Sequence, residues 1–182
     1  MAEIHSLGID GAWLYTTEVH NDSRGSFSEW FKSDFIEKKL DRKFVVAQSN
    51  ISKSKKGVVR GIHLSTAPEG QAKWVTCTDG SIWDVIVDLR TGSSTFKKWV
   101  SHELKAGQGE AIFIEEGLGH AFLALEEDSI VCYLTTSLYR PELEISISPH
   151  DSTLAITWPN DKFHLSKKDA EAITLNEYLN LR

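Results

Sequence analysis

The chain has 182 residues, of which 41% are hydrophobic and 25% are charged, and these values fit a single globular domain spanning residues 1–182. Its formal net charge of −6 argues against non-specific binding to nucleic acid or to an anionic membrane, because both need a basic field. Residues 1–13 lack the features of a signal peptide, and no stretch approaches the roughly 18 apolar residues of a membrane span. We therefore expect a cytoplasmic protein that contacts neither nucleic acid nor membrane.

Short apolar segments separated by turn signals run through most of the chain, with no internal repeat between them. A first helix is expected over Ser33–Leu40, capped by Ser33. The strands expected after it are Val45–Asn50, Lys73–Thr78, Ser81–Leu89, Phe96–Leu104, Ala111–Glu115, Ala121–Leu125 and Ser129–Thr135. A second helix is expected to begin near Lys167 after a Ser166 cap, with an apolar tail that docks on the strands. Many short strands at this spacing predict an antiparallel sandwich or jelly roll.

The clearest of these strands is Ser81–Leu89. Successive side chains of a strand point to opposite faces, so the two sets of alternate residues can be separated by position. We expect one face to carry Trp83, Val85, Val87 and Leu89, and the other to carry Ile82, Asp84, Ile86 and Asp88.

The segment Arg60–Lys73 concentrates chemically useful side chains within a turn-rich stretch. The planar guanidinium of Arg60 suits a phosphate, because it donates paired hydrogen bonds. The imidazole of His63 can remove a proton, and Lys73 offers a compact positive charge for a developing oxyanion. This segment is therefore predicted to hold an anionic substrate, deprotonate it and stabilise the product of that step.

A series of segments in family order resembles the dTDP-4-dehydrorhamnose 3,5-epimerase family of nucleotide-sugar epimerases, and the match runs from about residue 10 to residue 175. They are Asp22–Glu29, Gln48–Ser52, Gly57–His63, Gln71–Lys73, Asp84–Arg90, Ser94–Phe96, Glu116–Phe122, Tyr133, Tyr139–Glu142, Ile156–Pro159 and Leu165–Asp169. A single segment would be weak evidence, whereas the ordered series is specific. The resemblance implies an all-β fold, a cupin-type antiparallel β jelly roll with short peripheral helices. It also implies a homodimer that exchanges N-terminal strands.

The resemblance further implies a dTDP-sugar substrate of the dTDP-4-keto-6-deoxyglucose type and no metal or redox cofactor. Metal-binding cupins usually carry a His-x-His pair with a nearby glutamate. In this chain Ser65 interrupts that pattern after His63, so we do not expect a metal site.

The resemblance assigns four catalytic residues. His63 is implied to be the base, Asp169 its carboxylate partner, Tyr133 the acid on the opposite face of the sugar, and Lys73 the group beside the enolate oxygen. Three of these residues also have a structural alternative: Asp169 as a first-turn carboxylate of a helix, Tyr133 as a packed strand residue, and Lys73 as a solvated cation at a strand edge.

The implied substrate-binding residues are Arg24, Phe27, Glu29, Gln48, Asn50, Arg60, His120, Tyr139, Glu144 and Lys168. Arg24 and Arg60 would pair with phosphates, and Tyr139 would stack on the base. His120 has the alternative of a core histidine satisfied by the backbone. For Glu29, Glu144 and Lys168 the alternative is an ordinary solvated charge.

The chain departs from the usual family pattern at Leu64, Glu115, Leu118–Gly119 and Leu134, and we expect these residues to line the pocket and to alter sugar specificity. The leading hypothesis is epimerisation at C3, at C5 or at both. The alternatives are a mono-epimerase acting on a dTDP- or CDP-linked 4-keto sugar, a 3,4-ketoisomerase, and a non-catalytic cupin that binds nucleotide sugars.

Overall fold

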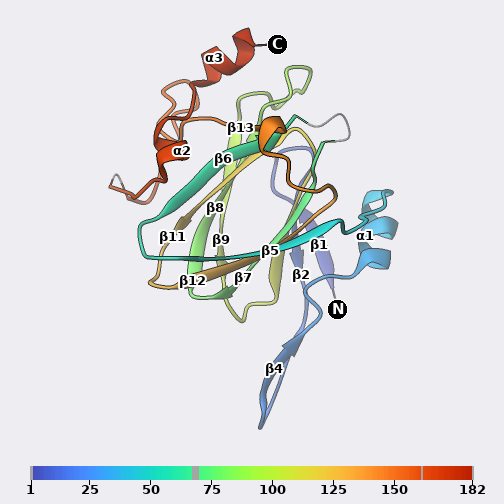
Figure 1. Cartoon of the computed structure of the whole chain (residues 1–182). Coiled ribbons are helices and arrows are strands. Elements are labelled where there is room, and N and C mark those ends of the chain that lie inside the picture. The colour runs from blue at the N-terminus through green and yellow to red at the C-terminus, as the bar shows by residue number, and fades with distance from the viewer. Residues whose placement is uncertain (1, 67–69, 161, 182) are drawn as a thin grey trace.

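The computed structural model, shown in Figure 1, describes residues 2–66, 70–160 and 162–181, which form two large antiparallel sheets and a small hairpin. The six-stranded sheet has the order β1 (Glu3–Ser6), β2 (Ala12–Thr16), β10 (Glu110–Ile114), β7 (Lys73–Asp79), β12 (Ser129–Thr135) and β5 (Gln48–Ser54). The five-stranded sheet has the order β13 (Glu144–Ser146), β6 (Val59–Ser65), β11 (Leu118–Ala124), β8 (Ser81–Asp88) and β9 (Trp99–Lys105). In the described ranges, no helix combines the length and the apolar character needed to cross a membrane.

The main hydrophobic cluster lies between the inner faces of the two large sheets. It joins Val75 of β7 and Ile112 of β10 to Ile82 and Ile86 of β8. The mostly β architecture with antiparallel sheets confirms the predicted jelly-roll class. Burying this apolar surface is the main favourable contribution to folding.

The two faces predicted for Ser81–Leu89 are confirmed by the packing of β8. Ile82 and Ile86 belong to the inner cluster, whereas Val85 and Val87 belong to a second cluster on the outer face. The C-terminal segment covers that outer face with α2 (Lys167–Ala170) and α3 (Leu175–Asn180), as Figure 1 shows. Leu175 and Tyr178 of α3 are buried in this second cluster, so the prediction of a docked apolar tail is also confirmed.

A third cluster covers the outer face of the six-stranded sheet under α1 (Ser33–Leu40). Trp74 of β7 packs there and donates its indole N–H to the carbonyl oxygen of Trp30 at 2.7 Å. The helix bounds were predicted correctly, but the Ser33 cap was wrong. Lys32 occupies the N-cap position without a side-chain cap bond, and Ser33 is the first helical residue.

Several strand bounds differ from the sequence-based expectation. β5 begins at Gln48 rather than Val45, and β9 begins at Trp99 rather than Phe96, because a turn with Lys97 at φ 67° precedes it. β6 lies within the segment that was interpreted as turn-rich. The strands β1, β2 and β13 were not predicted; each is short, with three to five residues, and offers little periodic signal. Residues 67–69 of the segment Arg60–Lys73 lie outside the described part of the chain.

The hairpin of β3 (Val19–Asp22) and β4 (Gly25–Ser28) extends away from the two large sheets, as Figure 1 shows. Phe27 on β4, which pairs with His20 on β3, is 66% exposed. Large exposed aromatic side chains on a protruding arm are typical of a surface that binds another molecule. The two strands of this hairpin were not predicted from the sequence, although residues within it were expected to bind substrate.

The first prediction concerns Asp88, a fully buried carboxylate at the end of β8. It accepts hydrogen bonds from Arg90, Ser93 and Thr95. Burial raises the pKa of Asp88, but these hydrogen bonds outweigh it and lower the pKa to about 2. The ionised carboxylate therefore stabilises the fold above its unfolded pKa of about 3.9, and this contribution is lost as the pH falls toward 2.

We expect Asp88→Asn to lower the free energy of unfolding by about 2–4 kcal/mol at pH 7, because buried donors lose a charged acceptor. The difference from the wild type should shrink as the pH falls from about 5 to 2. Urea unfolding of both proteins over this range measures it. A difference that stays constant with pH would contradict this role for the carboxylate.

Candidate active site

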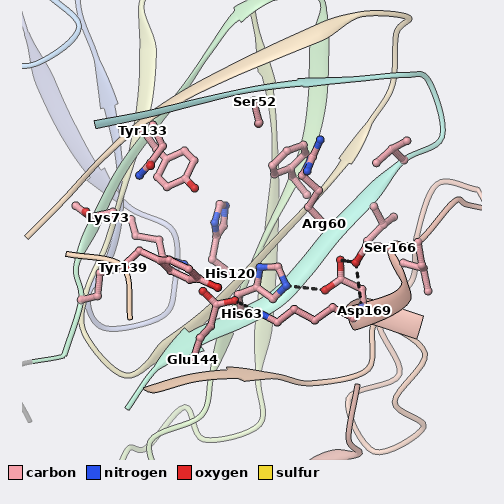
Figure 2. A pocket seen from close by; sticks show the side chains of 18 of the residues that line it. Ser52, Arg60, His63, Lys73, His120, Tyr133, Tyr139, Glu144, Ser166 and Asp169 are labelled. Carbon is pink, nitrogen blue, oxygen red and sulfur yellow. Dashed lines mark hydrogen bonds and ion pairs between the residues drawn. The ribbon is translucent and has the colours of Figure 1, made fainter. Parts of the chain in front are cut away.

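A cavity of about 560 Å³ opens between the inner faces of the two large sheets, at the end where the apolar cluster gives way to polar side chains. Strands β5, β7 and β12 supply one wall, β6 and β11 the facing wall, and the segment that leads into α2 the third side. Figure 2 shows the side chains directed into this space. The cavity is lined by Gln48, Asn50, Ser52, Val58, Val59, Arg60, His63, Gln71, Lys73, His120, Phe122, Tyr133, Thr135, Tyr139, Glu144, His164, Leu165, Ser166, Lys168 and Asp169.

A short hydrogen bond joins His63 on β6 to Asp169 on α2. The Nε2 atom of His63 lies 2.6 Å from Oδ1 of Asp169, whose side chain is 4% exposed. Burial raises the pKa of Asp169, but the hydrogen bond and charge of His63, together with Ser166 and the backbone of Gly61, lower it overall. The carboxylate is therefore ionised at neutral pH and leaves Nδ1 of His63 as the ring nitrogen that faces the cavity, as Figure 2 shows.

Ser166 fixes the carboxylate in this position. Its Oγ accepts a hydrogen bond from the backbone N–H of Asp169 at 3.1 Å and donates one to Oδ2 at 2.9 Å. The N-cap predicted at Ser166 is thus confirmed, and the same hydroxyl orients the partner of His63. Asp169 is both a first-turn carboxylate and a neighbour of the histidine, so the two interpretations made from the sequence describe one residue.

A second histidine–aspartate pair lies beside the first. His120 on β11 is the cross-strand neighbour of His63, and its Nε2 lies 2.7 Å from Oδ2 of the fully buried Asp84 on β8. His120 lines the cavity. Within residues 2–66, 70–160 and 162–181, no group of three or more His, Cys, Asp or Glu side chains is arranged to hold a metal ion.

Lys73 projects from the first residue of β7 into the cavity and is 9% exposed. Burial lowers the pKa of its ammonium group to about 8, against the opposing influence of Glu144 and Asp84. A lysine of this pKa is still mostly protonated at pH 7. Its positive charge is thus held inside a low-polarity space, where it acts strongly on a nearby oxyanion.

Tyr133 on β12 enters the cavity from the wall opposite His63. Its strand belongs to the six-stranded sheet, whereas His63 belongs to the five-stranded sheet. Burial raises the pKa of the Tyr133 phenol, so the group is protonated at neutral pH. A group that can accept a proton and a group that can donate one therefore lie on opposite walls of the cavity, as Figure 2 shows.

Six further residues predicted to bind substrate lie around these groups: Gln48, Asn50, Arg60, Tyr139, Glu144 and Lys168. Arg60 donates Nε–H to Oγ of Ser54 at 3.0 Å and an Nη2 hydrogen to the carbonyl oxygen of Lys53. Lys168 forms an ion pair with Glu144. Glu144 and Lys168 are therefore cavity residues rather than isolated solvated charges.

The structure does not bring Arg24, Phe27 and Glu29 to the cavity. Arg24 and Phe27 lie on the β3–β4 hairpin and Glu29 directly follows it, and none of the three is among the lining residues. The guanidinium of Arg24 pairs with Asp22 on the same hairpin at 2.6 Å. Within one chain these residues belong to a separate surface.

The expectation that the departures from the family pattern line the pocket was wrong. Leu64 packs in the cluster under the C-terminal segment, and Leu134 packs in the cluster under α1. Leu118 belongs to the inner apolar cluster, and Glu115 pairs with Arg42. Leu64 and Leu134 lie behind the cavity walls, because neighbouring residues of a strand point to opposite faces.

Sequence reasoning missed several cavity residues, among them Ser52, Gln71, Thr135, His164 and Ser166. For Ser52 a signal was present, since it shares the period-two face of Gln48 and Asn50. His164 reaches the cavity through an isolated parallel bridge to Val58. Such a bridge between distant segments has no local sequence pattern.

Comparison with known proteins now gives this geometry a context. The family model described as dTDP-4-dehydrorhamnose 3,5-epimerase matches residues 6–177. A dTDP-4-dehydrorhamnose 3-epimerase of Streptomyces niveus is 41% identical over 96% of this chain and 84% of its own length. A probable dTDP-4-oxo-2,6-dideoxy-D-glucose 3,5-epimerase of Streptomyces antibioticus is 43% identical over 85% of this chain and 76% of its own.

A solved structure is also closely similar. The crystal structure of a 4-keto-6-deoxy sugar epimerase from the novobiocin biosynthetic gene cluster of Streptomyces spheroides superposes with a TM-score of 0.96 at 40% sequence identity. The match covers 100% of this chain and 91% of the other. The agreement extends across both sheets and the C-terminal segment.

The second prediction concerns the proton on the His63 ring. Because Asp169 is ionised and accepts from Nε2, we expect neutral His63 to carry its proton on Nε2 and to leave Nδ1 unprotonated. Long-range ¹H–¹⁵N correlation spectra of ¹⁵N-histidine-labelled protein measure the tautomer. Asp169→Ala should remove this preference, and a wild-type ring protonated on Nδ1 would contradict the arrangement.

Proposed function

The chain belongs to the dTDP-4-dehydrorhamnose 3,5-epimerase family, and we propose that it inverts C3, C5 or both centres of a dTDP-4-keto-6-deoxyhexose in the cytoplasm. The reaction runs by proton removal and return through an enolate and uses no cofactor. One observation carries this proposal: the His63–Asp169 pair and Tyr133 occupy opposite walls of one cavity, with Lys73 also projecting into it. An epimerase needs this two-sided arrangement, because the proton leaves from one face and returns to the other.

Proton removal is assigned to Nδ1 of His63. A hydrogen on the carbon beside a ketone is acidic, because the resulting anion spreads onto the carbonyl oxygen. Asp169 holds the ring in the required tautomer and stabilises the imidazolium that forms. The ammonium group of Lys73 stabilises the enolate oxygen, and the enclosed cavity strengthens that interaction.

Proton return is assigned to the phenol of Tyr133. Burial raises its pKa, which keeps the phenol protonated until a strongly basic carbanion accepts the proton. Because the phenol and His63 face the sugar from different walls, donation by Tyr133 inverts the centre. A ketoisomerase would instead return the proton to another atom and needs no acid opposite the base, so the position of Tyr133 favours epimerisation.

The nucleotide is assigned to the polar part of the cavity around Arg60, Gln48 and Asn50. The guanidinium of Arg60 suits the pyrophosphate, and the half-exposed ring of Tyr139 offers a surface for the base. The relatives differ in the centres that they are named for, C3 in one case and C3 with C5 in the other. Mono-epimerisation at C3 is therefore the second candidate.

We further propose a homodimer in which the β3–β4 hairpin of one protomer reaches the cavity of the other. This arrangement would place Arg24, Phe27 and Glu29 at the nucleotide, although they lie away from the cavity of their own chain. The hairpin protrudes, and its Phe27 side chain is exposed. Val45 and Ile51, near and on the edge strand β5, are further exposed apolar side chains that a second copy would cover.

The third prediction tests the reaction with dTDP-4-keto-6-deoxyglucose in D₂O, read by mass spectrometry and NMR at C3 and C5. Deuterium together with inversion at both carbons establishes 3,5-epimerisation, and both changes at C3 alone establish a 3-epimerase. His63→Asn should reduce exchange by about 10²–10⁴-fold, because the base is lost. His5→Asn, an exposed histidine on β1, serves as the matched control.

Tyr133→Phe separates the two proton transfers. We expect this variant to retain deuterium exchange, because His63 can still remove and return a proton on its own face, but to lose inversion. Binding of the substrate without exchange by the wild type would support the non-catalytic alternative. A 3-keto product would establish the ketoisomerase alternative.

The fourth prediction tests the exchanged hairpin. Arg24→Ala and His63→Ala chains should each be nearly inactive alone. A co-folded 1:1 mixture should regain about a quarter of wild-type activity, because half of the dimers would contain one intact site. Sedimentation confirms the dimer. Absence of recovery in a mixture that does form dimers would contradict the exchange.

A further inference from the structure

Ser52 on β5 lines the cavity, yet its Oγ atom is buried and has no hydrogen-bond partner among the described residues. Figure 2 shows its side chain directed into the cavity. The two other aliphatic hydroxyl groups of the described cavity wall are already paired: Thr135 donates to the carbonyl oxygen of Ser137, and Ser166 donates to Asp169. An unpaired buried hydroxyl destabilises a fold, so a ligand group that pairs with it is bound favourably.

The register of β5 places this hydroxyl within the proposed site. Asn50 lies opposite Tyr133 on β12, and Ser52 lies opposite Val131, one inward-facing pair further along. Arg60 donates Nε–H to Ser54, the next inward-facing residue of β5. Ser52 thus lies between the phenol assigned to the sugar and the guanidinium assigned to the pyrophosphate, as Figure 2 also shows.

The chemistry of the substrate class identifies the group that lies there. In a nucleotide-linked hexose, the anomeric carbon carries the phosphate, and C2 separates it from C3. A hydroxyl on C2 is therefore the sugar's hydrogen-bonding group between the phosphate and a reacting C3 centre. The relative from Streptomyces antibioticus is named for a 2,6-dideoxy sugar, which lacks this hydroxyl.

We infer that Ser52 Oγ hydrogen-bonds the C2 hydroxyl of the bound sugar and thereby selects 6-deoxy over 2,6-dideoxy substrates. This inference rests on the proposed function. A site built around a hydrogen bond rejects the analogue that lacks the group, because its own polar atom is then left unpaired.

The test compares wild type, Ser52→Ala and Ser49→Ala on dTDP-4-keto-6-deoxyglucose and on its 2-deoxy analogue. Ser49 is a matched control, because it lies on the exposed face of the same strand. We expect Ser52→Ala to reduce kcat/KM for the hydroxylated sugar by about 10–100-fold. The kcat/KM of the wild type should fall by a similar factor on the 2-deoxy analogue. On that analogue, Ser52→Ala should lower kcat/KM no further, so that the two losses do not multiply. Ser52→Thr should recover part of the activity.

Two further measurements separate substrate contact from a structural role. The Tm of Ser52→Ala should stay unchanged or rise, because the substitution removes an unpaired buried hydroxyl, and the Kd for dTDP alone should not change. The inference would be overturned if wild type and Ser52→Ala had equal kcat/KM on the hydroxylated sugar. It would also be overturned if the losses from the substitution and from the 2-deoxy analogue multiplied, or if Ser52→Ala bound dTDP more weakly. A wild type that binds both sugars but exchanges no deuterium would instead refute the proposed function and, with it, this inference.

Discussion

The bond between His63 and Asp169 is the interaction on which the site depends. A carboxylate that is 4% exposed needs partners for both oxygens, and the fold supplies them from two distant segments. β6 brings the imidazole, and the capped turn of α2 brings the carboxylate together with Ser166. The C-terminal segment reaches this place because Leu175 and Tyr178 are buried on the outer face of β8. Apolar packing on the outer face of the five-stranded sheet thus positions the carboxylate of Asp169 beside His63.

The space between the two large sheets holds an apolar cluster at one end and the polar cavity at the other. At one end Ile82, Ile86 and Ile112 form a closed apolar cluster. At the other end the neighbouring strands β11, β12 and β7 direct His120, Tyr133 and Lys73 into the cavity. Strands supply rigid positions for such groups, which holds His63 and Tyr133 on opposite walls of the cavity. The low polarity of the shared interior also explains why burial lowers the pKa of Lys73 and raises that of Tyr133.

Much of this architecture is predictable from local sequence. The alternation in Ser81–Leu89 correctly assigns β8 to two buried faces, and Ser166 correctly marks the start of α2. The hairpin β3–β4 has no buried face, so its strands lack the apolar alternation that would reveal them. Leu64 and Leu134 follow His63 and Tyr133 in the sequence but point away from the cavity, and adjacency in sequence was therefore a poor guide to them. The pairing of Ser52 with Val131 depends on strand register, which no single segment specifies.

The separation of His63 from Asp169 along the chain has a consequence for how the proposed activity is acquired and lost. His63 and Asp169 are 106 residues apart, and α2 is held in place by the docking of the segment that contains it. Segments at the periphery of a fold open with a smaller free energy than the sheets beneath them. Undocking of this tail would separate base from carboxylate while both sheets remain intact. The proposed activity therefore depends on the docked tail, and cleavage of an undocked tail would abolish that activity while the two sheets remain folded.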